Sequence, residues 1–166
     1  MEDKTTEILK CAILMEKRGQ AFYRKVAQQA SGEVVKRFFE LMAEEESNHI
    51  KLLSDQFKAY QEAQQFTLID MVDDCQSDIA SQILSKHIRT EITAADYEAA
   101  AISAAMSMEE NAVKLYSERA LATTDPNEKA LYDWLADWET QHLNFLAEID
   151  RDLTEDIWYD QNFWPF

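Results

Sequence analysis

The second half of the chain repeats the first at a fixed distance, and this repeat limits the fold more than any other feature. Glu139 and His142 lie 93 residues after Glu46 and His49, so the motif Glu-x-x-His occurs twice at one offset. A spacing of three residues is close to one helical turn and places both side chains of each motif on one helix face. The chain is therefore predicted to contain two copies of one helical unit.

The same offset also pairs residues upstream of the two motifs. The stretch AILMEKRGQAFY aligns without a gap with AMSMEENAVKLY, at residues 12–23 and 105–116. This alignment pairs two glutamates and two tyrosines, namely Glu16 with Glu109 and Tyr23 with Tyr116. Each unit is thus predicted to supply one further glutamate and one tyrosine from a second helix.

The repeat distinguishes between glutamates that spacing alone leaves equivalent. Glu46 ends a run of three glutamates, but Glu45 pairs with a tryptophan in the second unit, so Glu46 is the favoured member. Glu109 pairs with a glutamate, whereas Glu110 pairs with a lysine. Glu110 is therefore predicted to be a surface charge.

Composition and periodicity predict an all-α protein. The chain has only two glycines and two prolines, and apolar residues recur at the three- and four-residue steps of a helix. In the last helix this stripe comprises Leu131, Leu135, Glu139, His142, Leu146 and Ile149. The predicted organisation is a single domain with a helical hairpin at 5–61, a crossover at 62–92 with a short helix near 77–88, a second hairpin at 93–152 and an aromatic tail at 153–166.

Helix boundaries are predicted from local signals. Ser31 and Gly32 should stop the first helix, and Thr93 should cap the third. Asp125 followed by Pro126 is typical of the start of a helix, here the fourth.

Six polar residues on the inward stripes predict a metal centre. Buried carboxylates are costly unless they are compensated, and two divalent cations would balance four of them. The predicted ligands are Glu16, Glu46, His49, Glu109, Glu139 and His142. A single Glu-x-x-His is usually a solvated face or a local hydrogen bond, but two at one offset, each with a glutamate partner, favour metal. The third histidine, His87, has no counterpart and is interpreted as a surface or packing residue.

The donor types favour two iron ions as the cofactor. Mixed oxygen and imidazole ligands suit iron or manganese, so a manganese or mixed pair is the alternative. Tyr23 and Tyr116 lie two turns beyond Glu16 and Glu109 on the same faces. Either a hydrogen bond to a ligand carboxylate or simple core packing would explain these tyrosines.

Charge and cysteine content exclude several other classes of protein. The formal net charge of −16 disfavours nucleic acid and anionic membranes as partners, and the N-terminal residues do not form a signal peptide. Cys11 and Cys75 form no Cys-x-x-Cys pair and are interpreted as buried, reduced thiols. A cytoplasmic location is the expectation.

With these motifs, the chain resembles the rubrerythrin branch of the ferritin-like superfamily over residues 5–150. The resemblance implies a ferritin-like four-helix bundle with a non-haem di-iron site, often dimeric, that reduces hydrogen peroxide or oxidises ferrous iron with oxygen in oxidative-stress defence. Two departures stand out. The chain has no cysteine pair for a rubredoxin domain, which implies an external electron donor, and Met106 occupies the place of an additional rubrerythrin glutamate.

Two other functions are compatible with the same sequence. One is metal binding or iron storage without catalytic turnover. The other is a helical interaction module that uses the C-terminal aromatic residues, which are expected to pack on the bundle or on a second subunit of a homodimer. These residues are Trp158, Tyr159, Phe163, Trp164 and Phe166.

Overall fold

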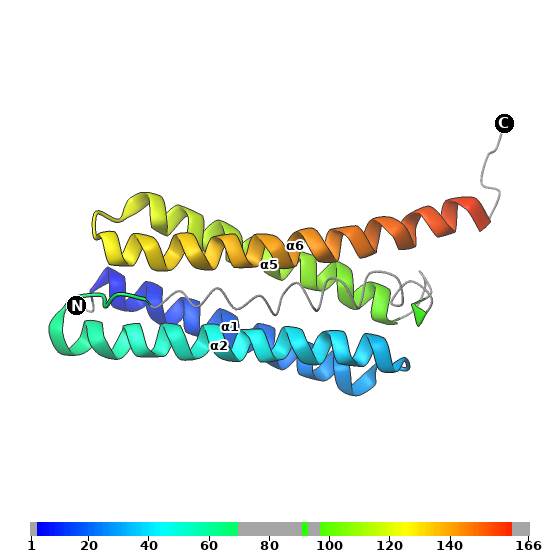
Figure 1. The fold of residues 1–166 in the computed structure, drawn as a ribbon, viewed down its shortest axis with the longest axis horizontal. Helices are drawn as coiled ribbons and strands as arrows, with labels where there is room; N and C mark the ends of the chain where they lie inside the picture. Colours follow the sequence, from blue (N-terminus) through cyan, green and yellow to red (C-terminus); the bar gives the residue numbers. More distant parts are fainter. Residues whose placement is uncertain (1–2, 70–90, 93–96, 161–166) are drawn as a thin grey trace.

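The described part of the chain is a bundle of four long helices. The computed structural model describes residues 3–69, 91–92 and 97–160, and the side chains as far as residue 155. The helices are α1 (Lys4–Gln29), α2 (Glu33–Ala63), α5 (Tyr97–Ala122) and α6 (Pro126–Asp160). Helices α1 and α2 form one antiparallel hairpin and α5 and α6 the other (Figure 1). This arrangement confirms the predicted all-α four-helix fold.

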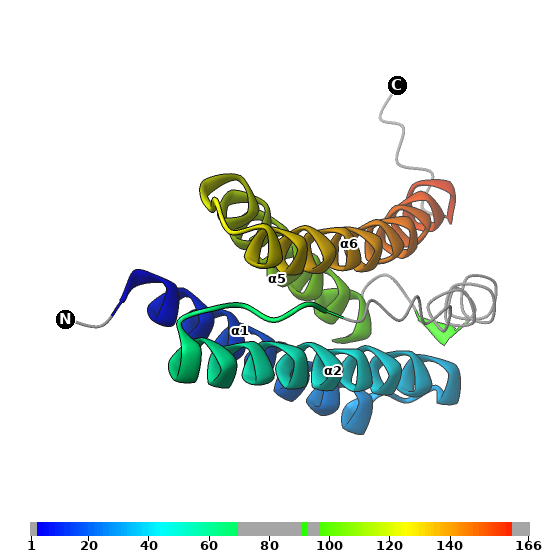
Figure 2. The same ribbon diagram turned by 60° about the vertical axis from the view of Figure 1, so that its left-hand side comes forward.

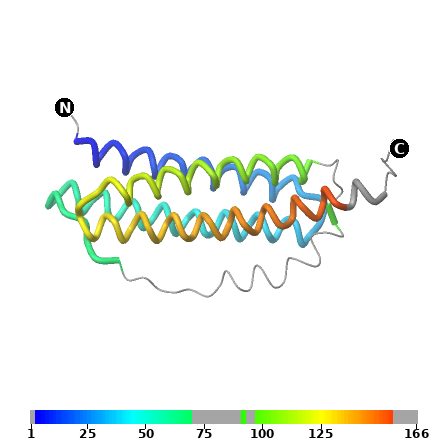
Figure 3. Tube along the Cα trace, turned by 90° about the horizontal axis from the view of Figure 1, so that it is seen from above, coloured from blue at the N-terminus to red at the C-terminus, as the bar shows by residue number. Residues whose placement is uncertain are grey.

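The two hairpins pack as two layers, as the turned view shows (Figure 2). Seen from above, α1 and α5 run side by side along the bundle, and these two helices are in contact (Figure 3). Because the sequence repeat coincides with the hairpins, equivalent residues of the two units face one another across the interface between the layers. None of the helices in the described ranges is both long and apolar enough to cross a bilayer.

The turn between α1 and α2 contains a close approach at Gly32, directly before α2. The Glu91 carboxylate accepts hydrogen bonds from the backbone N–H groups of Val34 and Val35, at 3.1 and 3.4 Å. A Cβ atom at Gly32 would lie 2.0 Å from this carboxylate. Glycine at this position therefore lets a side chain from outside the hairpin cap the start of α2.

The turn between α5 and α6 follows the predicted signal. The Asp125 side chain accepts hydrogen bonds from the backbone N–H groups of Asn127 and Glu128, at 2.8 and 3.1 Å, and α6 starts at Pro126. The first turn of α6 is thus capped by a side-chain acceptor. The predicted cap at Thr93 lies outside the described residues.

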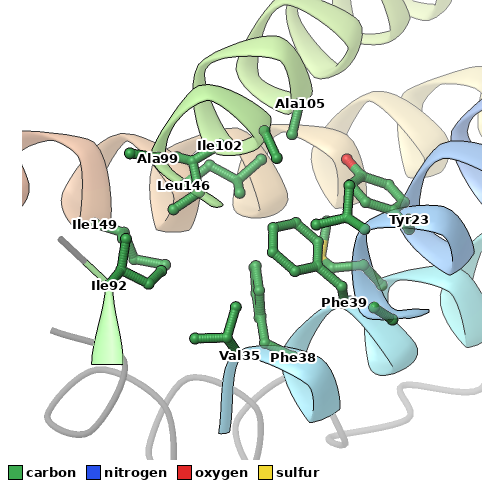
Figure 4. Packing of buried hydrophobic residues seen from close by; sticks show 14 of the residues in the cluster. Tyr23, Val35, Phe38, Phe39, Ile92, Ala99, Ile102, Ala105, Leu146 and Ile149 are labelled. Carbon is green, nitrogen blue, oxygen red and sulfur yellow. The ribbon is translucent and has the colours of Figure 1, made fainter. Parts of the chain in front are cut away.

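Two apolar clusters fill the bundle on either side of its middle. One cluster packs Phe38 and Phe39 of α2 against Ile102 of α5 and Leu146 of α6 (Figure 4). The second cluster includes Leu9, Leu53, Tyr116, Leu131 and Leu135. Each fully buried side chain of this size contributes about 1.5–3 kcal/mol. The predicted stripe of α6 is confirmed, since all of its residues are buried.

Two predictions need correction, and several others lie outside the described residues. Helix α6 continues to Asp160, past the predicted end at residue 152, because no glycine or proline follows Pro126 until Pro165. Cys11 is exposed, not buried, because it lies off the inward face of α1. The short helix at 77–88, His87, Cys75 and the aromatic side chains from Trp158 onward lie outside the described residues and side chains.

Candidate metal centre

The six predicted ligands meet in the middle of the bundle, between the two apolar clusters. Each of the four helices contributes at least one of them, and the two Glu-x-x-His motifs approach from α2 and α6. All six are buried, with at most 6% of the residue surface exposed: Glu16, Glu46, His49, Glu109, Glu139 and His142. The structure therefore brings together every residue that the repeat selected.

The donor atoms form two overlapping groups of four residues, within each of which all the atoms lie within 4.8 Å of one another. Glu16 and His49 belong to one group, and Glu109 and His142 to the other. Both groups also contain Glu46 and Glu139, which lie between the two sides. This is the arrangement expected of two adjacent metal positions with two shared carboxylates.

Both histidines turn the Nδ1 atom towards the carboxylates. His49 Nδ1 lies 2.9 Å from Glu139 Oε1 and 3.4 Å from Glu16 Oε2. His142 Nδ1 lies 3.1 Å from Glu139 Oε2 and 3.9 Å from Glu109 Oε1. The centroids of the two imidazole rings are 6.2 Å apart. Each group thus has one imidazole nitrogen directed at its carboxylates.

Several polar atoms of the centre are buried without a hydrogen-bond partner among the described residues. They are Glu46 Oε2, His49 Nδ1 and Glu139 Oε1. The separation of 2.9 Å between the last two atoms is short, but its geometry is not that of a hydrogen bond. Leaving such an atom unsatisfied costs about 1–3 kcal/mol. Cations would satisfy these lone pairs, so the residues fit a pair of metal ions, and the oxygen and imidazole donors suit iron or manganese.

The pKa shifts of residues in the centre also favour a bound cation. Burial raises the pKa of Glu46 and of Glu109 well above the ordinary value for glutamate. Burial also acts to raise the pKa of Glu139, but the neighbouring His49 and His142 outweigh it and lower that pKa. Burial lowers the pKa of both histidines, and their glutamate contacts more than reverse this effect. Without metal, the cluster therefore holds protons that a cation must displace.

Each tyrosine forms a hydrogen bond with a glutamate of the other hairpin. The Tyr23 hydroxyl on α1 donates a hydrogen bond to Glu109 on α5, and the Tyr116 hydroxyl on α5 donates one to Glu16 on α1. Burial raises the pKa of both hydroxyls, with smaller contributions from the glutamate charges. The tyrosines consequently remain protonated donors at neutral pH. Both alternatives left by the sequence are observed, because each hydroxyl bonds to a glutamate and each ring packs in an apolar cluster.

Gly19 contributes to the centre and was not singled out from the sequence. A Cβ atom at this position would lie 3.1 Å from Glu46 Oε1 and 3.2 Å from its Cδ atom. Beside Gly19, a small cavity reaches Glu16, Glu46 and Glu109 and is lined on its other sides by Met15, Met108 and Ala112. The sequence did contain a signal for this role, because a glycine inside a helix costs about 1 kcal/mol relative to alanine and Gly19 lies within the buried stripe of α1.

Glu45 also contacts the centre, although the repeat disfavoured it. Glu46 belongs to both groups of donors, as predicted, while Glu45 belongs to neither. The Glu45 carboxylate instead lies 2.5 Å from Nε2 of His142, on the outer edge of the ring. The repeat selects only glutamates that have a glutamate counterpart, and so it missed a residue that contacts a predicted ligand.

Met106 does not take part in the centre. Its side chain is partly buried and packs against the apolar cluster that contains Phe38 and Leu146. The place of the additional rubrerythrin glutamate is thus part of the hydrophobic core in this chain.

A comparison with protein families identifies a match over most of the chain. The model of the rubrerythrin family matches residues 7–150, which include both hairpins and all six predicted ligands. No curated protein and no solved structure gives a significant match to the chain.

Proposed function

We propose that this chain, which belongs to the rubrerythrin family, is a non-haem di-iron oxidoreductase that reduces hydrogen peroxide, oxidises ferrous iron with oxygen, or does both. The observation that carries the proposal is the pair of overlapping donor groups with two shared glutamates. Four carboxylates and two neutral imidazoles would balance the charge of two divalent cations. No other buried group in the described ranges combines acidic and imidazole donors in this way.

The ligand roles follow from membership of the two groups. Glu46 and Glu139 would bridge the two positions, while Glu16 with His49 and Glu109 with His142 would complete one position each. Two ferrous ions, when bound, would supply the two electrons that, with two protons, reduce hydrogen peroxide to two water molecules.

The protein would hold the ligand carboxylates in place, keep the centre largely free of water and let a small oxidant reach it. Tyr23 and Tyr116 hold Glu109 and Glu16 through their hydroxyl protons, and their raised pKa values favour a holding role over proton donation. The cavity beside Gly19 gives a small oxidant a place next to the carboxylates, and Met15 and Met108 make its lining largely apolar. An oxidant with two non-hydrogen atoms, such as oxygen or hydrogen peroxide, fits this role better than a larger substrate.

Three further parts of the proposal come from the sequence, the first two of them through the family resemblance. The first is an external electron donor, which would return the centre to the ferrous state after peroxide reduction. The second is a homodimer, and the third is a role in the cytoplasm. Manganese in place of iron would keep the ligand roles and direct attention to other redox reactions of peroxide.

Single-turnover kinetics test the proposal. Metal-free protein is loaded anaerobically with two equivalents of ferrous iron and mixed with hydrogen peroxide or with oxygen, and the ferric absorbance is followed. We expect stoichiometric oxidation in the wild type and its loss in Glu109→Gln. The matched control is Glu110→Gln, which changes the next residue on an exposed face and should oxidise like the wild type.

Two outcomes would count against the proposal. Equal oxidation rates in the Glu109→Gln variant and the wild type would remove the assigned ligand role. Accumulation of many ferric ions per chain, with no sustained reduction of peroxide when a donor is supplied, would favour iron storage.

A further inference from the structure

The two halves of the metal centre differ next to their histidines. The repeat aligns all six predicted ligands and both tyrosines with residues of the same type, but it aligns Glu45 with Trp138. Both of these residues contact imidazole rings of the centre. The near-symmetry of the centre is therefore broken at this pair of positions.

On one side, a carboxylate holds the histidine. Glu45 Oε2 lies 2.5 Å from His142 Nε2, and both side chains are largely buried, with 17% and 7% of their surfaces exposed. A ring N–H donates and a carboxylate oxygen accepts, so at this distance Nε2 carries a proton and donates a hydrogen bond to Glu45. When Nε2 holds this proton, Nδ1 is the ring nitrogen that can bind a metal, and it points towards Glu139 and Glu109.

On the other side, two indole rings pack against His49. The rings of Trp134 and Trp138 lie edge-to-face with His49, with centroids 5.8 and 6.0 Å away. Each ion pair that the described residues give His49 is made through Nδ1, on its inner edge. His49 is thus oriented by packing against two tryptophans of α6.

We propose that Glu45 is a positioning residue that makes the two metal positions inequivalent, by fixing the ring and tautomer of His142 so that this position binds its ion more tightly. The inference rests on the proposed metal centre. A carboxylate on the outer nitrogen of a ligand histidine makes the inner nitrogen a stronger donor, and loss of such a partner typically lowers metal affinity about 10- to 100-fold. The position at His49 has no such partner among the described residues.

Cobalt titration of metal-free protein tests this inference without turnover. Co²⁺ is an air-stable probe with spectra that depend on its ligands, and its uptake can be followed by absorbance and calorimetry. We expect two binding steps in the wild type. Glu45→Ala should weaken the tighter step about 10- to 100-fold and leave the weaker step unchanged. Glu45→Gln keeps a hydrogen-bond acceptor without the charge, and its affinity in the tighter step should lie between those of the wild type and Glu45→Ala.

The control is Glu44→Ala, which removes the adjacent glutamate. Glu44 is 63% exposed, and its carboxylate is 3.5 Å from Arg37 on the surface of α2. This variant should titrate like the wild type. A second measurement separates positioning from a general loss of structure: proton NMR of the cobalt form should show a shifted His142 N–H signal that exchanges slowly in the wild type and in Glu45→Gln, and rapidly in Glu45→Ala.

The outcomes separate this inference from the proposed function. A wild type that takes up no cobalt would remove the metal centre and the inference with it. A wild type that binds two ions, with both steps unchanged in Glu45→Ala, would overturn the inference alone. Equal weakening of both steps would also overturn it, because it would assign Glu45 a general electrostatic or structural effect.

Discussion

Replacement of Gly19 by alanine should separate metal affinity from fold stability. In the interior of a helix, alanine is favoured over glycine by about 1 kcal/mol. The new Cβ atom, however, would lie 3.1 Å from Glu46 Oε1, whereas ordinary contacts of this kind begin near 3.4 Å. Glu46 must therefore move by about 0.3 Å, because the backbone on both sides is helical.

The consequence differs between the metal-free and the metal-bound protein. In the metal-free form the gain in helix propensity and the cost of moving Glu46 oppose each other, so stability should change by no more than about 1 kcal/mol in either direction. In the bound form Glu46 would be shared by both metals, and ligand distances tolerate only about ±0.2 Å. We expect affinity to fall at least about 10-fold, equivalent to about 1.4 kcal/mol.

The second glycine supplies the matched control. In Gly32→Ala the Cβ atom would displace the Glu91 carboxylate that caps α2, which should cost about 0.5–2 kcal/mol of stability. Gly32 directly precedes the first residue of α2, away from the metal centre, so metal affinity should not change. Urea unfolding of the metal-free proteins and cobalt titration measure the two quantities separately. Wild-type affinity in Gly19→Ala would refute the reasoning.

Three more predictions follow from the same contacts. Tyr23→Phe removes the hydroxyl donor to Glu109 and should weaken cobalt binding about 10-fold without unfolding the protein, so unchanged affinity in a titration would contradict the assigned role. Glutamate contacts raise the pKa values of His49 and His142, the two predicted ligand histidines, so these groups bind protons as the pH falls and metal affinity should decrease. Calorimetry in buffers of different ionisation enthalpy should detect proton release on metal binding, and no release would contradict this prediction. Arg119→Met leaves the buried Glu128 carboxylate without its ion-pair partner at 2.5 Å, with the Thr123 hydroxyl as a remaining donor, and should cost about 3–5 kcal/mol in urea unfolding. Lys129→Met on the surface should cost less than about 1 kcal/mol, and similar losses in the two variants would be inconsistent with a buried pair.

The bundle and the assembly of the six polar residues were predictable from the sequence, because both depend on local periodicity. A helix places residues three and four apart on one face, so spacing alone assigns Glu139 and His142 to the same buried stripe as Leu135 and Leu146. The repeat then supplied the non-local information, since two copies of one hairpin bury their equivalent faces against each other.

Other contacts could not be predicted because they depend on side-chain positions across the bundle. Glu45 and His142 are 97 residues apart, and their contact follows from the rotation and register of α2 against α6. The close approach of Gly19 to Glu46 could be predicted only by knowing the direction in which the Glu46 side chain extends. Neither relation has a periodic signature along the chain.

The C-terminal end of α6 was predictable in principle. The stretch from Asn127 to Trp164 contains neither glycine nor proline, so nothing in the sequence stops the helix at residue 152. Because residues 153–166 are rich in aromatic side chains, they were predicted to form a separate tail, whereas the backbone remains helical to Asp160.

Elemental analysis of protein purified without a metal-affinity tag tests the central claim most directly. The two overlapping donor groups predict about two transition-metal ions per chain, as iron, manganese or a mixture. They also predict that Glu139→Gln, which changes a carboxylate shared by both groups, lowers this content below one ion per chain. A wild-type protein that contains no transition metal, and takes up none when ferrous iron or manganese is added, would contradict the account.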